Sequence, residues 1–309
     1  MASTGNRTPD NALFEPQPHR TPPAATPPAH PESPGFATRG EQDQARAESI
    51  ANLINSATAP SPMPSLRSGN ALSVAERAIA PLSNTLAAID AGIGVIVENL
   101  RNADTTGYKT SRTAIGDKRD VSMQVDVSQG ELLATNRALD IAIQGDGFLP
   151  VRIYPDGAPE GVVAYTRNGM LFMNNTGQIV VGDLKGYQLV PPIKFPGGVT
   201  QVTITQDGDV RVAVDRDQQT QSVGQISLAV FTDPTALSPL GGGVYEETAA
   251  SGRAISTPAG SRGAGRLIQG HVELSNLDLV REKLRLDFLK NWRATIVASM
   301  AQAAAEPHK

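Results

Sequence analysis

Few residues in this sequence have the type and spacing that catalysis or metal binding requires. Gly145-Asp146-Gly147 could start a phosphate-binding loop, but such a loop must open a helix, and a strand-like segment follows here. Asp207-Gly208-Asp209 begins like a calcium loop without the remaining carboxylate ligands. Of the four histidines, only His271 lies outside the two tails, so no histidine pair is available for zinc. These patterns predict no enzyme, no cofactor and no metal site.

Composition narrows the class of protein further. The 309 residues include 27 basic and 31 acidic side chains, which indicates a near-neutral protein of one or two domains that does not bind nucleic acid. Cysteine is absent, which excludes disulfides and thiolate chemistry, and aromatic residues make up 4%, which predicts an aliphatic core. No apolar run approaches the roughly 18 residues of a membrane span, and no signal-peptide pattern opens the chain. We therefore expect no direct membrane insertion. If the chain is exported, we expect export without a cleaved signal peptide.

Residues 1–70 differ from the rest of the chain, because they hold 12 of the 23 prolines. Proline removes backbone donors, and this segment offers too little apolar area to offset the entropy of ordering, so we predict a mostly disordered Pro-rich extension. A short helix over about 41–56 is compatible with Ile50, Leu53 and Ile54. The extension is either a solvated tail or a tether or export leader.

Two segments near the ends have helical periodicity. Apolar residues recur from Leu72 to Leu100 at alternating steps of three and four, which is typical of a seam between paired helices. Pro81 should interrupt this pattern and leave a helix over 82–102 that needs a partner, because Gly92 and Gly94 each weaken it by roughly 1 kcal/mol.

The partner is expected over 276–304, after a capping box formed by Ser275 and Asp278. We predict an assembly helix seam in which the two helices pair as a coiled-coil-like layer. Its residues are Leu82, Leu86, Ile89, Ile93, Ile96, Leu100, Leu277, Val280, Leu284, Phe288, Trp292 and Ile296.

Between these helices the apolar period becomes two. Leu139, Ile141 and Ile143 alternate before Gly145-Asp146-Gly147, and a second alternating run over 149–153 precedes Pro155-Asp156-Gly157, so we predict a hairpin at each turn. Further turn signals follow at 168–169, 174–177, 183–186 and 207–208. The fold class is therefore α+β, with N- and C-terminal helices around a central antiparallel β domain.

The end of the first helix carries a distinctive string, Asn99 to Lys109, read NLRNADTTGYK. It resembles the turn that closes the first helix in the bacterial flagellar rod and hook family. The residues of this family turn motif are Asn99, Leu100, Asn102, Thr105, Gly107, Tyr108 and Lys109. Further blocks resemble the family in the same order over about 82–285, and 223–248 is most similar to the distal rod subtype.

The resemblance implies a structural axial protein of the flagellar basal body that polymerises into the distal rod and transmits torque across the periplasm. It implies self-association into a helical tube, contact with other flagellar rod and hook proteins, and passage through the flagellar type III export apparatus. A proximal rod or hook-like paralogue, or a secreted β-rich adhesin or binding module on a Pro-rich tether, remains the alternative. The expected layout is an extension over 1–70, a helical segment with the turn motif over 71–110, a β-rich domain over 111–270 and a C-terminal helix over 271–309.

Overall fold

The computed structural model describes residues 39–58, 74–115, 121–155, 158–182, 186–214, 220–261 and 263–305. The chain divides into two units, Met1–Asp43 and Gln44–Lys309. The described part of the first unit is helical. The helix pair, the sheets and the hydrophobic core all belong to the second unit.

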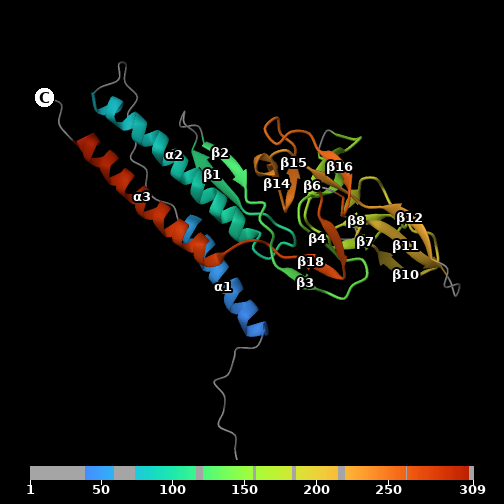
Figure 1. Ribbon diagram of the computed structural model, residues 1–309. Coiled ribbons are helices and arrows are strands. Elements are labelled where there is room, and N and C mark those ends of the chain that lie inside the picture. The colour runs from blue at the N-terminus through green and yellow to red at the C-terminus, as the bar shows by residue number, and fades with distance from the viewer. Residues whose placement is uncertain are drawn as a thin grey trace, which may run out of the picture. The chain divides into compact units, whose positions relative to one another are not determined.

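The described residues form three α-helices: α1 (Arg39–Thr58), α2 (Val74–Arg101) and α3 (Leu279–Ala305). Helices α2 and α3 lie side by side (Figure 1) and run antiparallel, because Leu86 in the middle of α2 packs with Met300 near the end of α3, whereas Leu100 at the end of α2 shares a cluster with Leu286 near the start of α3. Helix α1 contains the short helix expected over 41–56, and the rest of the segment predicted to be disordered lies outside the described residues. None of these described helices combines the length and the apolarity needed to cross a bilayer.

Two helix boundaries differ from the sequence predictions. Helix α2 continues through Pro81 instead of beginning after it. Helix α3 begins at Leu279, because the Asp278 carboxylate accepts hydrogen bonds from the amides of Val280 and Arg281 at 3.0 and 3.1 Å. The N-cap is therefore Asp278 rather than Ser275.

The middle of the chain is a set of antiparallel sheets, and the largest has seven strands in the order β14-β15-β6-β5-β9-β8-β7. A 3₁₀ turn, η1 (Pro234–Ala236), precedes β14. The strands are β1 (Ser111–Ile115), β2 (Val121–Val125), β3 (Leu132–Ala134), β4 (Ile141–Gln144), β5 (Leu149–Ile153), β6 (Val162–Thr166), β7 (Leu171–Met173), β8 (Ile179–Val181), β9 (Tyr187–Leu189), β10 (Val199–Ile204), β11 (Asp209–Val214), β12 (Thr220–Gln225), β13 (Ser227–Val230), β14 (Ser238–Gly241), β15 (Val244–Glu246), β16 (Ile255–Pro258), β17 (Arg266–Gln269) and β18 (His271–Glu273).

Most turn signals join paired strands, and two do not. Besides the signal at 145–147, the one at 168–169 lies between β6 and β7, which are not neighbours in the sheet. Strands β5 and β6, β7 and β8, β8 and β9, and β10 and β11 pair as predicted. The hairpin predicted at 145–147 is wrong, because β4 pairs with β17 while β5 pairs with β6 and β9. The chain crosses between sheets here because the Arg167 guanidinium donates hydrogen bonds to the carbonyls of Ile143, Gly145 and Gly147. Those carbonyls therefore accept hydrogen bonds from an arginine side chain instead of from the backbone amides of a hairpin.

The core of the β domain is mainly aliphatic, as the low aromatic content predicts. Leu149, Val151, Val212 and Leu228 are fully buried in one cluster that spans several sheets. Four of the six sheets formed by the described residues therefore contribute to one interior, and the helices lie outside it, so the α+β class is confirmed.

Candidate functional site

The family turn motif reverses the chain after α2 and directs it into β1. Asn99 is completely buried, and its side-chain amide donates to the carbonyl of Ser111 at 2.9 Å. Its side-chain oxygen accepts from the Ser111 amide at 2.9 Å and from the Tyr108 hydroxyl at 3.1 Å. One asparagine thus satisfies groups on both sides of the reversal, which a similarly sized leucine could not do.

The remaining motif residues shape the turn itself. Asn102 donates to the carbonyl of Glu98 at 2.9 Å and accepts from the Thr105 hydroxyl at 3.1 Å. Gly107 has a φ of +68°, and a Cβ there would lie 2.3 Å from the carbonyl carbon of Arg167. Only glycine fits this position, because both the conformation and the close backbone approach exclude a side chain.

Lys109 ends the motif inside a buried ion-pair network that we call the junction, formed by Lys109, Arg167 and Glu273. The Lys109 Nζ atom lies 2.6 Å from Glu273 Oε1, and Arg167 Nε lies 2.8 Å from Glu273 Oε2. The three side chains are 1, 4 and 0% exposed, so no part of the network is screened by water. The Gly130 amide also donates to Glu273, and Lys109 donates to the carbonyl of Ser128. The junction therefore ties the end of α2 to β18 and to the loop after β6.

Two tyrosines enclose the junction. The Tyr245 hydroxyl accepts from the Lys109 amide at 2.9 Å and donates to the Lys109 carbonyl at 3.1 Å. Burial raises the pKa of Tyr245 and Tyr108 far above the usual value, and burial lowers the pKa of Lys109 while the Glu273 carboxylate opposes that shift. The hydrogen bonds of the junction join one protein group to another, so this cluster fixes the geometry of the chain at the end of α2.

Sequence reasoning found Lys109 but missed its partners. Arg167, Tyr245 and Asn276 all lie in blocks that resemble the family, so those blocks carried a usable signal. Asn276, just before α3, accepts from the Thr110 amide at 2.9 Å and donates to the Asp126 carbonyl at 2.7 Å. Glu273 could have been inferred only by asking which acid neutralises two buried cations.

The α2 half of the assembly helix seam is buried within the chain. Leu86, Ile89, Ile93, Ile96 and Leu100 are each at most 8% exposed, and Leu82 is partly buried. Gly92, expected to weaken the helix, allows α3 to approach, because a Cβ there would lie 3.1 Å from Leu289 Cδ1. At this position the missing side chain therefore serves helix packing.

The α3 half of the seam divides between two faces of the helix. Leu277 and Ile296 are partly buried against α2, together with the fully buried Leu286. The other four predicted residues are exposed in this single chain, three of them by more than half, and are not in the clusters that pack against α2; we call them the outer row. They are Val280, Leu284, Phe288 and Trp292, which are 69, 65, 64 and 38% exposed.

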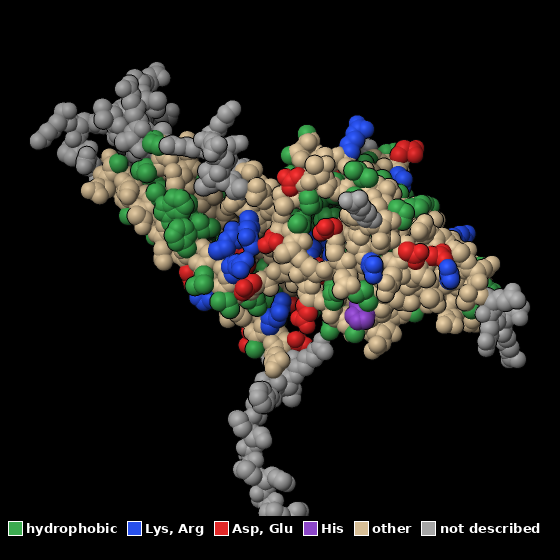
Figure 2. Space-filling model, viewed as in Figure 1, with side chains coloured by type: hydrophobic (Ala, Val, Ile, Leu, Met, Phe, Trp, Pro, Cys, Tyr) green, Lys and Arg blue, Asp and Glu red, His purple; other side chains and the backbone are tan. Residues whose placement is uncertain are grey.

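Figure 2 shows a patch of hydrophobic side chains over α3. The Phe288 and Trp292 rings contact each other at a centroid distance of 5.9 Å. The sequence of α3 has apolar residues at steps of three and four on several sides of the helix. The spacing alone therefore does not tell the face that packs on α2 from the face that carries the outer row. Their role in assembly stays a prediction.

Comparison with known proteins defines the class of this molecule. A family model described as the flagellar hook protein FlgE/F/G D1 domain matches residues 142–212, which cover β4 to β11. Flagellar basal-body rod protein FlgG of Caulobacter vibrioides is 34% identical over 235 residues, covering 67% of this chain and 87% of that protein. FlgG of Buchnera aphidicola subsp. Schizaphis graminum is 33% identical, covering 63% of this chain and 83% of that protein. The match is thus to a protein of the flagellar axis.

The chain belongs to the family of flagellar basal-body rod proteins FlgG. Membership confirms the predicted structural role in the distal rod and does not favour the proximal-rod, hook-like or adhesin alternatives. Flagellar basal-body rod protein FlgF of Salmonella typhimurium is 31% identical over 132 residues, which cover 49% of that protein. The names of these relatives describe structural rod proteins and indicate no catalytic function.

Proposed function

We propose that this chain polymerises with copies of itself, and joins other flagellar rod and hook proteins, to form the distal part of the rod. The observation that carries this proposal is the outer row. Four large apolar side chains stand exposed on a helix whose opposite face is already packed. A contiguous apolar row on a folded chain marks a contact with another protein.

The proposed layers follow from which surfaces are already packed within the single chain and which remain exposed. Helices α2 and α3 would form the inner layer as a coiled-coil-like pair that gains its remaining contacts from neighbours, and the β domain over 111–270 would form the outer layer. The junction supports torque transmission, because it joins the two layers through buried ion pairs rather than a flexible linker. Passage of the unfolded chain through the type III export apparatus, without a cleaved signal peptide, belongs to the same proposal.

The proposed role is mechanical and not catalytic, as the names of the relatives indicate. The buried polar groups of the junction contact one another, which supports a load-bearing connection. Domain limits at 70, 110 and 270 are part of this proposal and match the ends of the helical and β-rich segments only approximately.

Complementation tests the proposal directly. A strain lacking this gene should regain motility and complete rods with the unaltered chain, and should regain neither with Phe288→Asp, because a carboxylate would be buried at the contact between copies. Asn291→Asp places the same charge on an exposed polar position of α3 and is the matched control. Motile cells with Phe288→Asp would contradict the assembly role of the outer row.

A further inference from the structure

Helix α1 rests on the helix pair through a narrow apolar edge. Ile50 and Leu53 are 8 and 9% exposed and share one cluster with Ile93 and Ile96 of α2 and Leu286 of α3. The residues of α1 from 42 to 49 are all exposed. Few side chains hold α1 in place, so this contact is suited to reversible binding.

A polar contact fixes where α1 binds. The Arg46 guanidinium donates to the carbonyl of Ala103 at 3.3 Å and lies 3.3 Å from the Asp104 carboxylate. Both partners follow the C-terminal end of α2, where free carbonyls and the helix dipole favour a cation. Helix α1 is therefore placed at one end of the groove between α2 and α3.

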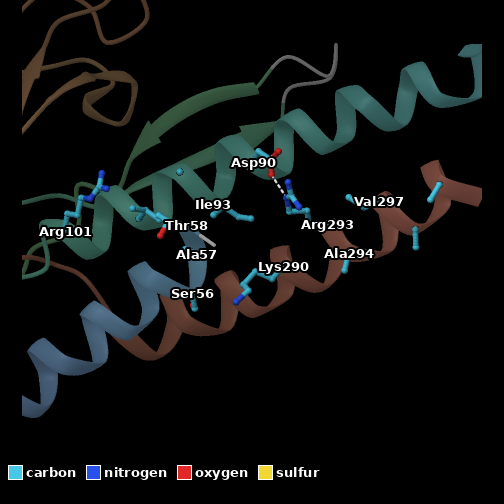
Figure 3. A pocket seen from close by; sticks show the side chains of 14 residues that line it. Ser56, Ala57, Thr58, Asp90, Ile93, Arg101, Lys290, Arg293, Ala294 and Val297 are labelled. Carbon is cyan, nitrogen blue, oxygen red and sulfur yellow. Dashed lines mark hydrogen bonds and ion pairs between the residues drawn. The ribbon is translucent and has the colours of Figure 1, made fainter. Parts of the chain in front are cut away.

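The groove continues beyond the end of α1 as an open cavity of about 980 Å³ (Figure 3). Ser56, Ala57 and Thr58 at the end of α1 form one edge of it, and the other described lining residues come from α2 and α3. Part of the lining consists of small residues, Gly94, Ala294, Ala298 and Ala301, and the rest includes apolar side chains and an ion pair at 2.7 Å between Arg293 of α3 and Asp90 of α2. Small side chains let another helix approach closely, and α1 fills only part of this groove.

We propose that α1 is a removable cover: in the free chain it occupies part of the groove into which the outer row of a second copy docks in the polymer. The inference rests on the proposed function. The groove continues directly from the surface that already holds a helix, and an apolar helix row without a partner is present on the same chain. Two helices cannot occupy one groove, so α1 reduces the fraction of chains that can bind a neighbour and raises the concentration needed for polymerisation.

Substitution of the buried edge of α1 tests the cover in the full chain. Ile50→Asp with Leu53→Asp should release α1 and lower the critical concentration for polymerisation, measured by sedimentation, at least fivefold. Ala47→Asp with Ala51→Asp adds the same charge to exposed positions of α1 and should leave that concentration within twofold of the unaltered chain. Trp292 is the only tryptophan, so its emission should shift to shorter wavelength as the outer row becomes buried.

Circular dichroism should be used to check that each variant is folded, and a chain beginning at Met63 gives a second way to remove α1. An unchanged or raised critical concentration in both the double variant and the chain beginning at Met63 would overturn the proposal that α1 is a cover, while leaving the proposed function intact. A polymer in which Trp292 emission stays unshifted would overturn the outer row as the docking element. Failure of the unaltered chain and of every variant to polymerise would contradict the proposed function itself.

Discussion

The junction and the outer row are opposite kinds of surface on the same chain. The junction buries three charges, and each finds its partners within the molecule. The outer row exposes four apolar side chains, which find no such burial in the single chain. The polar groups that connect the helices to the β domain thus have their partners before assembly. The apolar side chains of the outer row lack theirs until another protein covers them.

This contrast assigns different consequences to substitutions in the two regions. Changes in the junction should destabilise the free chain, because an unpaired buried charge has no route to water. Changes in the outer row should leave the free chain stable and act on assembly, because those side chains already contact solvent.

The largest expected effect is at Glu273. Glu273→Gln leaves Lys109 and Arg167 as buried cations without a carboxylate, which should lower the free energy of unfolding by about 3–5 kcal/mol. Glu131→Gln is the matched control, because Glu131 is exposed on the segment that leads into β3. Urea denaturation followed by circular dichroism measures both, and equal stabilities would show that the junction does not hold the fold together.

The same leucine-to-alanine substitution at Leu284 and at Leu286 compares the exposed and the buried face of α3. Leu286→Ala removes a fully buried side chain and should lower the free energy of unfolding by about 2–5 kcal/mol. Leu284→Ala changes a side chain that is 65% exposed and should cost less than about 0.5 kcal/mol in the free chain. Thermal unfolding of the two variants checks this, and a similar loss at both positions would mean that α3 has no outer face.

The smallest effect concerns alkaline pH at Tyr165, whose ring contacts that of Phe231 and lies in the same buried cluster as Tyr245 of the junction's surroundings. Burial and the neighbouring Glu247 carboxylate raise the pKa of Tyr165 from its usual value of about 10 to about 12. A raised pKa means that the folded state favours the protonated phenol, so this stabilisation is complete below pH 10 and is lost as pH rises through 12. Tyr165→Phe should flatten the fall in stability over this range in denaturation curves taken at successive pH values. An unaltered slope would remove Tyr165 as a source of alkaline sensitivity.

The sequence predicted those features that depend on local periodicity. Apolar steps of three and four located α2 and α3, and alternation with turn residues located the hairpins β5–β6, β7–β8, β8–β9 and β10–β11. Pairings between strands far apart in the sequence, such as β4 with β17, were not predicted. It failed at 145–147, where Arg167, some twenty residues later in the chain, takes the carbonyls that a hairpin would use. Long-range polar contacts leave no periodic trace in one sequence.

The helix faces show the same limit. Spacing alone placed Leu284 and Phe288 in a seam with α2, but α3 is apolar on several sides, and packing selected Leu286 instead. Ile50, Leu53 and Ile54 indicated a short helix, but nothing in the Pro-rich segment predicted that this helix would pack against that pair, because an apolar stripe does not identify the surface it contacts. Tertiary packing decides between faces that are equally apolar.

The central claim is that the outer row becomes buried between copies of the chain. The chain has no cysteine, so Phe288→Cys supplies a single thiol for maleimide labelling, with full labelling of denatured rods as the control. The account predicts rapid labelling in the free chain and at least tenfold slower labelling in isolated rods. Equal labelling rates in the free chain and in intact rods would contradict it.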